Sequence, residues 1–159
     1  MKDQFVKALI VGLLVVAVGV GGILFMQRGA HMDLKGSMNI RLHATDKDTT
    51  LAIIDLNLAN PASYGFQVSD VEVNLESKAG DATTRVVSKV DVQRLQEAMP
   101  ELGSFHPTLY TKYVVPPQST GRYTLLAQFS FPQQMLVDRK QFVVRIREVN
   151  GKVAEITEK

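Results

Sequence analysis

The chain of 159 residues contains no cysteine and no tryptophan, and aromatic residues make up only 7% of it. Without cysteine there is no disulfide framework, no thiolate nucleophile and no cysteine near the N-terminus that could carry a lipid. Neither sign of charge dominates: the chain has 18 Lys and Arg and 16 Asp and Glu, which gives a net charge of +2. This balance gives no electrostatic case for binding nucleic acid.

Recognisable catalytic and metal-binding motifs are absent from the sequence as well. The three histidines, His31, His43 and His106, do not stand at metal-ligand spacing with another His, Asp or Glu. There is no G-x-S-x-G elbow and no glycine-rich phosphate loop. We therefore predict no catalytic, cofactor-binding or metal site, no cofactor, and a protein that is not an enzyme.

The longest hydrophobic run covers residues 8–26 and carries no charged or polar side chain. As a helix it would extend for about 28 Å, close to the hydrocarbon thickness of a bilayer. A cleaved signal peptide would have an apolar region of only roughly 7–15 residues, and a buried soluble helix would show a polar face. The run therefore predicts a single transmembrane anchor at 8–26, after a tail at 1–7 and before a tether at 27–35.

Membrane orientation follows from the layout of the chain, because the positive charges near the anchor are tied: Lys2, Lys7 and the α-amino group precede it, and Arg28, Lys35 and Arg41 follow it. A short tail containing Lys2 and Lys7 precedes the anchor, and a large domain follows it. This is the usual arrangement of a signal-anchor, so we expect the domain on the extracytoplasmic side of the cell membrane.

Small residues form a stripe along the predicted anchor, and they are Ala8, Gly12, Gly19 and Gly22. Ala8 and Gly12 have the small-xxx-small spacing that lets helices approach closely in lipid. The stripe is consistent with a homodimer, but glycine is also simply common in membrane helices. Both interpretations stay open.

From residue 36 to 159 the hydrophobic period changes to two, which is typical of half-buried strands. Strands are expected at 37–45, 50–59, 65–77, 83–90, 108–115, 122–131, 141–149 and 152–156. In the second strand Ile54, Leu56 and Leu58 face one way, and Asp55 and Asn57 face the other. In the third strand the apolar positions change from even to odd, which predicts a β-bulge near Ser69–Asp70.

Turn chemistry separates the strands. Asn60-Pro61 ends one strand because proline lacks the N–H that a ladder needs and asparagine initiates turns. Asn150-Gly151 is a strong hairpin signal. A short helix is expected over residues 92–99, capped by Asp91, and residues 133–138 form a turn or a single helical turn. We assign Asn60-Pro61 and Asn150-Gly151 a structural role and expect neither to bind a ligand.

About seven or eight short strands, these turns and one short helix predict a mostly β, antiparallel β-sandwich. The series Leu56, Leu58, Asn60-Pro61, Phe66, Val68, Val71, Val73 and Leu75 resembles the water-stress-and-hypersensitive-response domain of the type-2 late-embryogenesis-abundant family. Bacterial membrane-anchored domains with fibronectin-like sandwiches are similar. The resemblance implies an immunoglobulin- or fibronectin-like sandwich and a link to envelope or desiccation stress, and it implies no active site. The anchor and the inserted helix depart from the plant members.

Two surfaces are candidates for a partner. Arg145 and Arg147 share one strand face and could bind an anionic headgroup or polymer, although acidic neighbours would neutralise them. The loop at 99–110 carries Phe105 and Tyr110, and sandwich domains often bind through such loops; the alternative is that this loop only covers an open end of the core.

We therefore expect a non-catalytic binding or scaffolding module of the cell envelope. Its partner would be another envelope protein, a lipid or a wall polymer. The alternative is a stress-protective or apolar-ligand-holding domain, which would need an apolar cavity between its sheets.

Overall fold

The computed structural model describes residues 34–78 and 80–158. The predicted tail, anchor and most of the tether, including Ala8, Gly12, Gly19 and Gly22, lie outside the described residues. Within the described ranges, no helix has both the length and the hydrophobicity to cross a bilayer.

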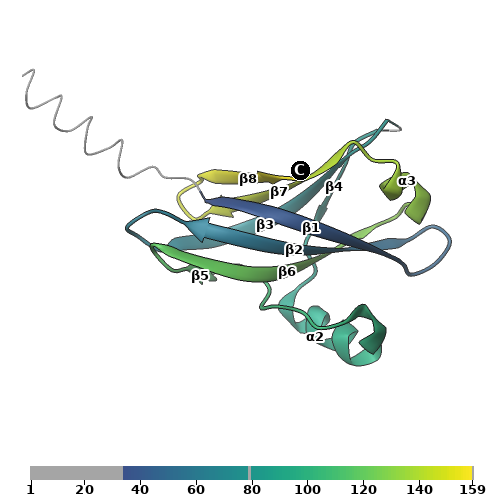
Figure 1. The fold of residues 1–159 in the computed structure, drawn as a ribbon, viewed down its shortest axis with the longest axis horizontal. Coiled ribbons are helices and arrows are strands. Elements are labelled where there is room, and N and C mark those ends of the chain that lie inside the picture. The colour runs from purple at the N-terminus through teal and green to yellow at the C-terminus, as the bar shows by residue number, and fades with distance from the viewer. Residues whose placement is uncertain (1–33, 79, 159) are drawn as a thin grey trace, which may run out of the picture. The chain divides into compact units, whose positions relative to one another are not determined.

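The described residues form eight strands in two antiparallel sheets, so the expected mostly β, sandwich-like architecture is confirmed (Figure 1). The first sheet has the order β1-β2-β6. The second has the order β4-β3-β7-β8, and the short β5 also pairs with β3. The strand bounds are β1 Lys35–Ala44, β2 Thr50–Asn60, β3 Phe66–Glu76, β4 Ala82–Arg85, β5 Val114–Val115, β6 Ser119–Phe129, β7 Gln141–Glu148 and β8 Val153–Thr157.

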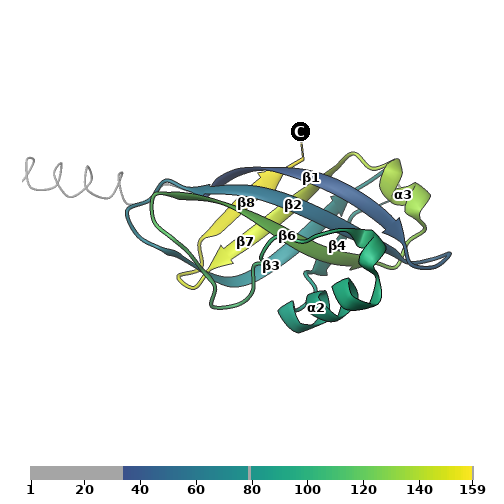
Figure 2. The ribbon, with the colours of Figure 1, turned by 60° about the horizontal axis from the view of Figure 1, so that its bottom comes forward.

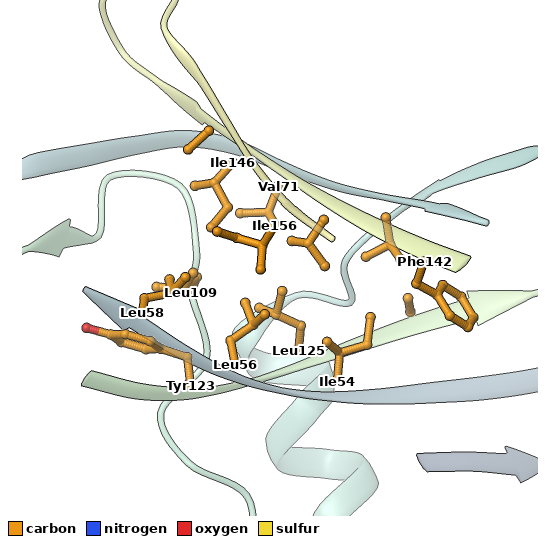
Figure 3. Close-up of a cluster of buried hydrophobic side chains, with 14 of the residues drawn as sticks. Ile54, Leu56, Leu58, Val71, Leu109, Tyr123, Leu125, Phe142, Ile146 and Ile156 are labelled. Atoms are coloured by element: carbon orange, nitrogen blue, oxygen red, sulfur yellow. The ribbon is translucent and has the colours of Figure 1, made fainter. Parts of the chain in front are cut away.

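The main core lies between the two sheets. Ile54, Leu56 and Leu58 of β2 are no more than 2% exposed, which confirms the inward face expected from their spacing. They face side chains of the second sheet such as Phe142 and Ile146 (Figure 3). Each such side chain stabilises the fold by roughly 1.5–3 kcal/mol relative to an exposed one.

The predicted β-bulge is confirmed in β3. Val68 pairs with Glu148 and Asp70 pairs with Arg147, which leaves Ser69 as the extra residue. The Ser69 hydroxyl donates to the backbone carbonyl of Arg147 at 3.1 Å. The bulge allows Val68 and the odd-numbered residues after it to enter the same core.

A second hydrophobic cluster lies on the outer face of the first sheet, and the sequence-based interpretation missed it. Leu51 and Ile53 of β2 and Leu126 of β6 are at most 4% exposed. They pack against Val92 of helix α2 (Lys89–Ala98) and Leu102 of the 3-10 helix η1 (Pro100–Leu102). Figure 2 shows this helical segment outside the sandwich, next to β6. The first sheet is therefore covered on both faces at one end.

Several predicted element bounds need correction. The helix begins three residues earlier than expected, because Ser88 and not Asp91 is its N-cap: the Ser88 hydroxyl accepts from the Asp91 backbone N–H at 3.3 Å. A further short helix, α3, covers Gln133–Val137. The strand expected at 108–115 is reduced to β5, since Lys112 has a φ of 74° and turns the chain.

Candidate functional site

The outer face of the first sheet changes character along its length. At one end the second hydrophobic cluster is covered by α2 and η1. At the other end the face is polar and open, and it forms a pocket of about 320 Å³. We call this pocket the polar recess, defined by Ser37, Asn39, Asp55, Asn57, His106 and Arg122.

Strand register places five of these side chains on one face. Ser37 pairs with Asn57, and Asn57 pairs with Arg122, so the three residues form one row across the sheet. Asn39 and Asp55 form part of the next row. Neighbouring strands lie about 4.8 Å apart, so a row of three residues extends for about 10 Å.

Asp55 is held in a fixed orientation at the floor of the recess. Its Oδ2 accepts from Nη2 of Arg41 at 3.1 Å and from Nε at 3.3 Å. Its Oδ1 accepts from the hydroxyl of Thr124 at 2.8 Å, and Thr124 is fully buried. Both oxygens of this carboxylate are therefore engaged, and the charge of Arg41 compensates that of Asp55.

The same network fixes the segment that carries His106. The His106 backbone N–H donates to Oγ1 of Thr124 at 3.0 Å, and the Thr124 backbone N–H donates to the carbonyl of Pro107 at 3.2 Å. Nη1 of Arg41 donates to the carbonyl of Leu102 at 3.0 Å. These bonds attach the chain after η1 to the sheet and place His106 at the edge of the recess.

The remaining polar side chains of the recess have no partner among the described residues. Within residues 34–78 and 80–158, no hydrogen bond or ion pair engages the side chains of Ser37, Asn39, Asn57 or Arg122. All four are exposed. The recess therefore combines a fixed floor with hydrogen-bonding groups that a ligand can engage.

The two aromatic residues singled out in the sequence have different surroundings. Phe105 is half-buried and packs against the second hydrophobic cluster. Tyr110 is 39% exposed, contacts the edge of Tyr113 with ring centroids 5.4 Å apart, and has Nζ of Lys89 at 5.0 Å from its ring centroid. It lines a second pocket of about 380 Å³ beside Arg85.

The two arginines singled out in the sequence lie on the outer face of the second sheet. Nε of Arg145 lies 2.7 Å from Oε1 of Glu155, so this arginine is paired. Arg147 is exposed and stands in register with Asp70, without an ion pair among the described residues. Acidic side chains of β3 and β8 thus lie beside the two arginines on this face.

The four turn residues occupy the ends of strands. Asn60 is 2% exposed at the end of β2, and Pro61 follows it. Asn150 and Gly151 connect β7 to β8, where Gly151 has a φ of 89°. Asn150 Oδ1 accepts from the backbone N–H of Lys152 at 2.9 Å.

Sequence reasoning missed the recess. The row of Ser37, Asn57 and Arg122 exists only once three distant segments are paired in register. The available signal was the outward alternation of Asp55 and Asn57 in a strand whose earlier outward positions are apolar. No group of three potential metal-ligating side chains occurs in the part of the chain that the structure describes.

Comparison with known proteins identifies no family. No protein-family model matches the chain, and no curated protein does. A solved structure of a Bordetella pertussis protein provisionally named ApaA is similar over 80% of this chain and 89% of its own, with 13% sequence identity and a TM-score of 0.39.

Proposed function

We propose that the protein is a single-pass, membrane-anchored binding module. Its domain lies on the extracytoplasmic side of the cell membrane and engages a partner through the polar recess without catalysis. The hydrophobic run at 8–26 and the short tail before it support the anchor and its orientation. The partner is a component of the envelope, because the anchor keeps the domain close to the bilayer.

The proposal includes an immunoglobulin- or fibronectin-like sandwich related to the type-2 late-embryogenesis-abundant domains. Strands β1, β2 and β6 form one sheet and β4, β3, β7 and β8 the other. Apart from the two-residue β5, which pairs with β3, this order of three strands against four supports the fibronectin-like assignment. The buried Asn60 before Pro61 supports the kinship with domains that share this dipeptide.

The observation that carries the binding role is the set of unengaged polar side chains above a rigid floor. The pairing of β2 with β1 and β6 and the hydrogen bonds of Asp55 fix that floor, so little ordering would be needed on binding. Asp55 already accepts hydrogen bonds on both oxygens, which suits a structural role better than that of a general base.

Four pockets of the described residues lie on outer faces and loops. Besides the recess and the pocket at Tyr110, one of about 440 Å³ and one of about 330 Å³ lie beside Arg139. These positions favour a ligand bound on the surface over an apolar ligand held between the sheets.

Site-specific photo-crosslinking in cells tests the binding role. A photo-reactive residue replaces Asn57 in the recess of the full chain, and in a matched control it replaces Thr83, which is exposed on β4 of the other sheet. We expect a discrete crosslinked product from position 57 and none from position 83. Equal products from both positions, or no product from position 57, would overturn the proposal.

Membrane orientation has its own test. Protease added to spheroplasts that carry the full chain should degrade the domain while a cytoplasmic control protein survives. Complete protection of the domain until the membrane is lysed would place it on the cytoplasmic side and contradict the proposal.

A further inference from the structure

We infer that the polar recess binds an anionic sugar, a saccharide unit that carries a carboxylate. This inference rests on the proposed binding role of the recess and adds the chemical class of the ligand. Charge, hydrogen-bonding capacity and the geometry of the sheet all contribute to it.

The recess has one positive charge in excess, which favours the binding of an anion. The Asp55 carboxylate is compensated by Arg41, whose guanidinium lies 3.1 Å from it. The guanidinium of Arg122 has no ion pair among residues 34–78 and 80–158 and is exposed to solvent. A guanidinium binds a carboxylate through two parallel hydrogen bonds, so Arg122 is the group that would receive the ligand's charge.

The neutral side chains match an array of hydroxyl groups. Asn39 and Asn57 each offer two donors and an acceptor, and Ser37 offers a hydroxyl that both donates and accepts. They lie in two adjacent rows on one face of the sheet, and the row that ends at Arg122 extends for about 10 Å. This area is wide enough for a sugar ring with its substituents.

A peptide fits the recess less well. A peptide strand adds to a sheet through free backbone groups, and in the order β1-β2-β6 these groups lie at the outer edges of β1 and β6, whereas β2 in the middle of the recess is paired on both sides. A peptide bound by its side chains needs apolar pockets, and the two apolar residues of the lining face the main core: Leu56 is 2% exposed, and Met38 packs against the same cluster.

Binding to the full chain in detergent or nanodiscs tests the inference with three probes. A galacturonate trisaccharide supplies carboxylates and hydroxyls, maltotriose supplies hydroxyls alone, and inorganic phosphate supplies an anion alone. We expect measurable binding of the galacturonate trisaccharide and at least about tenfold weaker binding of the other two, because only the first engages both kinds of group.

Matched variants locate the site. Arg122→Gln should weaken galacturonate binding by about tenfold or more. Arg145→Gln removes an exposed arginine from the other sheet and should leave binding unchanged. Asn57→Ala should weaken the binding of both saccharides. The substituted positions are exposed, and circular dichroism of each variant verifies its fold.

Three results would overturn the inference: equal binding of maltotriose, equal binding of phosphate, or an unchanged affinity in Arg122→Gln. The crosslinking experiment distinguishes a wrong ligand class from a wrong binding surface. A crosslinked product from position 57 without saccharide binding refutes the ligand class and leaves the binding role intact, and a protein product would identify a peptide partner. Absence of both signals refutes the role of the recess itself.

Discussion

The side-chain nitrogen of Asn60 lies 3.2 Å from the backbone carbonyl oxygen of Val115, 55 residues further along the chain. The same nitrogen donates to the carbonyls of Tyr64 and Pro116, each at 3.0 Å, and Oδ1 accepts from the Ala62 N–H at 3.1 Å. One buried amide thus connects the end of β2, the turn after it and the segment before β6. Asparagine precedes the proline here because the turn needs a donor and an acceptor on one short side chain.

Replacing Asn60 with aspartate should be strongly destabilising. The substitution exchanges the donating NH₂ group for an oxygen that faces three carbonyl oxygens in a site that is 2% exposed. We expect Asn60→Asp to lower the free energy of unfolding by about 3 kcal/mol or more, because three acceptors lose their donor and a charge is buried. Urea unfolding followed by circular dichroism measures the change.

Asn150→Asp is the matched control for that substitution. Asn150 uses only its oxygen, which accepts from the Lys152 backbone N–H, and aspartate retains that oxygen. The change in stability should stay within about 0.5 kcal/mol, as for other surface substitutions. Similar losses in both variants would show that the donor contacts of Asn60 contribute little.

The second hydrophobic cluster predicts that two adjacent leucines of β6 are both costly to truncate. Leu125 faces the main core and Leu126 faces α2, and both are 0% exposed. We expect Leu126→Ala to cost about 2–5 kcal/mol, comparable with Leu125→Ala. Gln128→Ala, on the same outer face but exposed, should have little effect. A Leu126→Ala variant as stable as Gln128→Ala would show that α2 and η1 do not seal this face.

Strand periodicity was sufficient to predict the main core, and its limits explain what was missed. Alternation identified Ile54, Leu56 and Leu58, and a change of phase identified the bulge at Ser69. Leu51 and Ile53 are apolar at outward positions of β2, a sign of a second covered face that the sequence analysis did not use. Which segment covers that face depends on tertiary packing, so the position of α2 could not be predicted from the period alone.

The recess illustrates a different limit. Its side chains come from β1, β2, β6 and the segment after η1, and none of those segments carries a local motif. His106 appeared as an isolated polar residue before a proline, and its position became clear only through the hydrogen bond of its backbone N–H to Thr124. Sites that arise from register across strands leave almost no trace in a single sequence.

Thr124 is expected to hold the segment at His106 onto the sheet. Its hydroxyl donates to Asp55 and accepts from the His106 N–H, and the side chain is fully buried. Thr124→Val keeps the shape but removes both hydrogen bonds, so we expect a loss of roughly 1–3 kcal/mol. Thr120→Val, exposed on the same strand and face, is the control and should have little effect. Faster amide exchange at His106 in Thr124→Val alone would confirm the local role; unchanged exchange there would contradict it.

The pair of Tyr113 and Tyr123 predicts a loss of stability at alkaline pH. Burial, followed by the hydrogen bond with Tyr113, raises the pKa of Tyr123 well above its ordinary value. Because the folded state holds this proton more tightly than the unfolded state, its contribution to stability is fully present below about pH 10 and is lost as the pH rises further. The free energy of unfolding should therefore fall steeply above about pH 10, which urea unfolding at a series of pH values measures.

Tyr123→Phe should flatten that alkaline slope, because phenylalanine cannot titrate. The variant also removes the hydroxyl that interacts with Tyr113, which changes stability at neutral pH by an amount independent of pH. The slope of the free energy of unfolding against pH, and not its value at neutral pH, therefore tests the role of Tyr123. If Tyr123→Phe kept the full alkaline slope, the loss of stability would have to come from other groups, and burial of the Tyr123 hydroxyl would not control it.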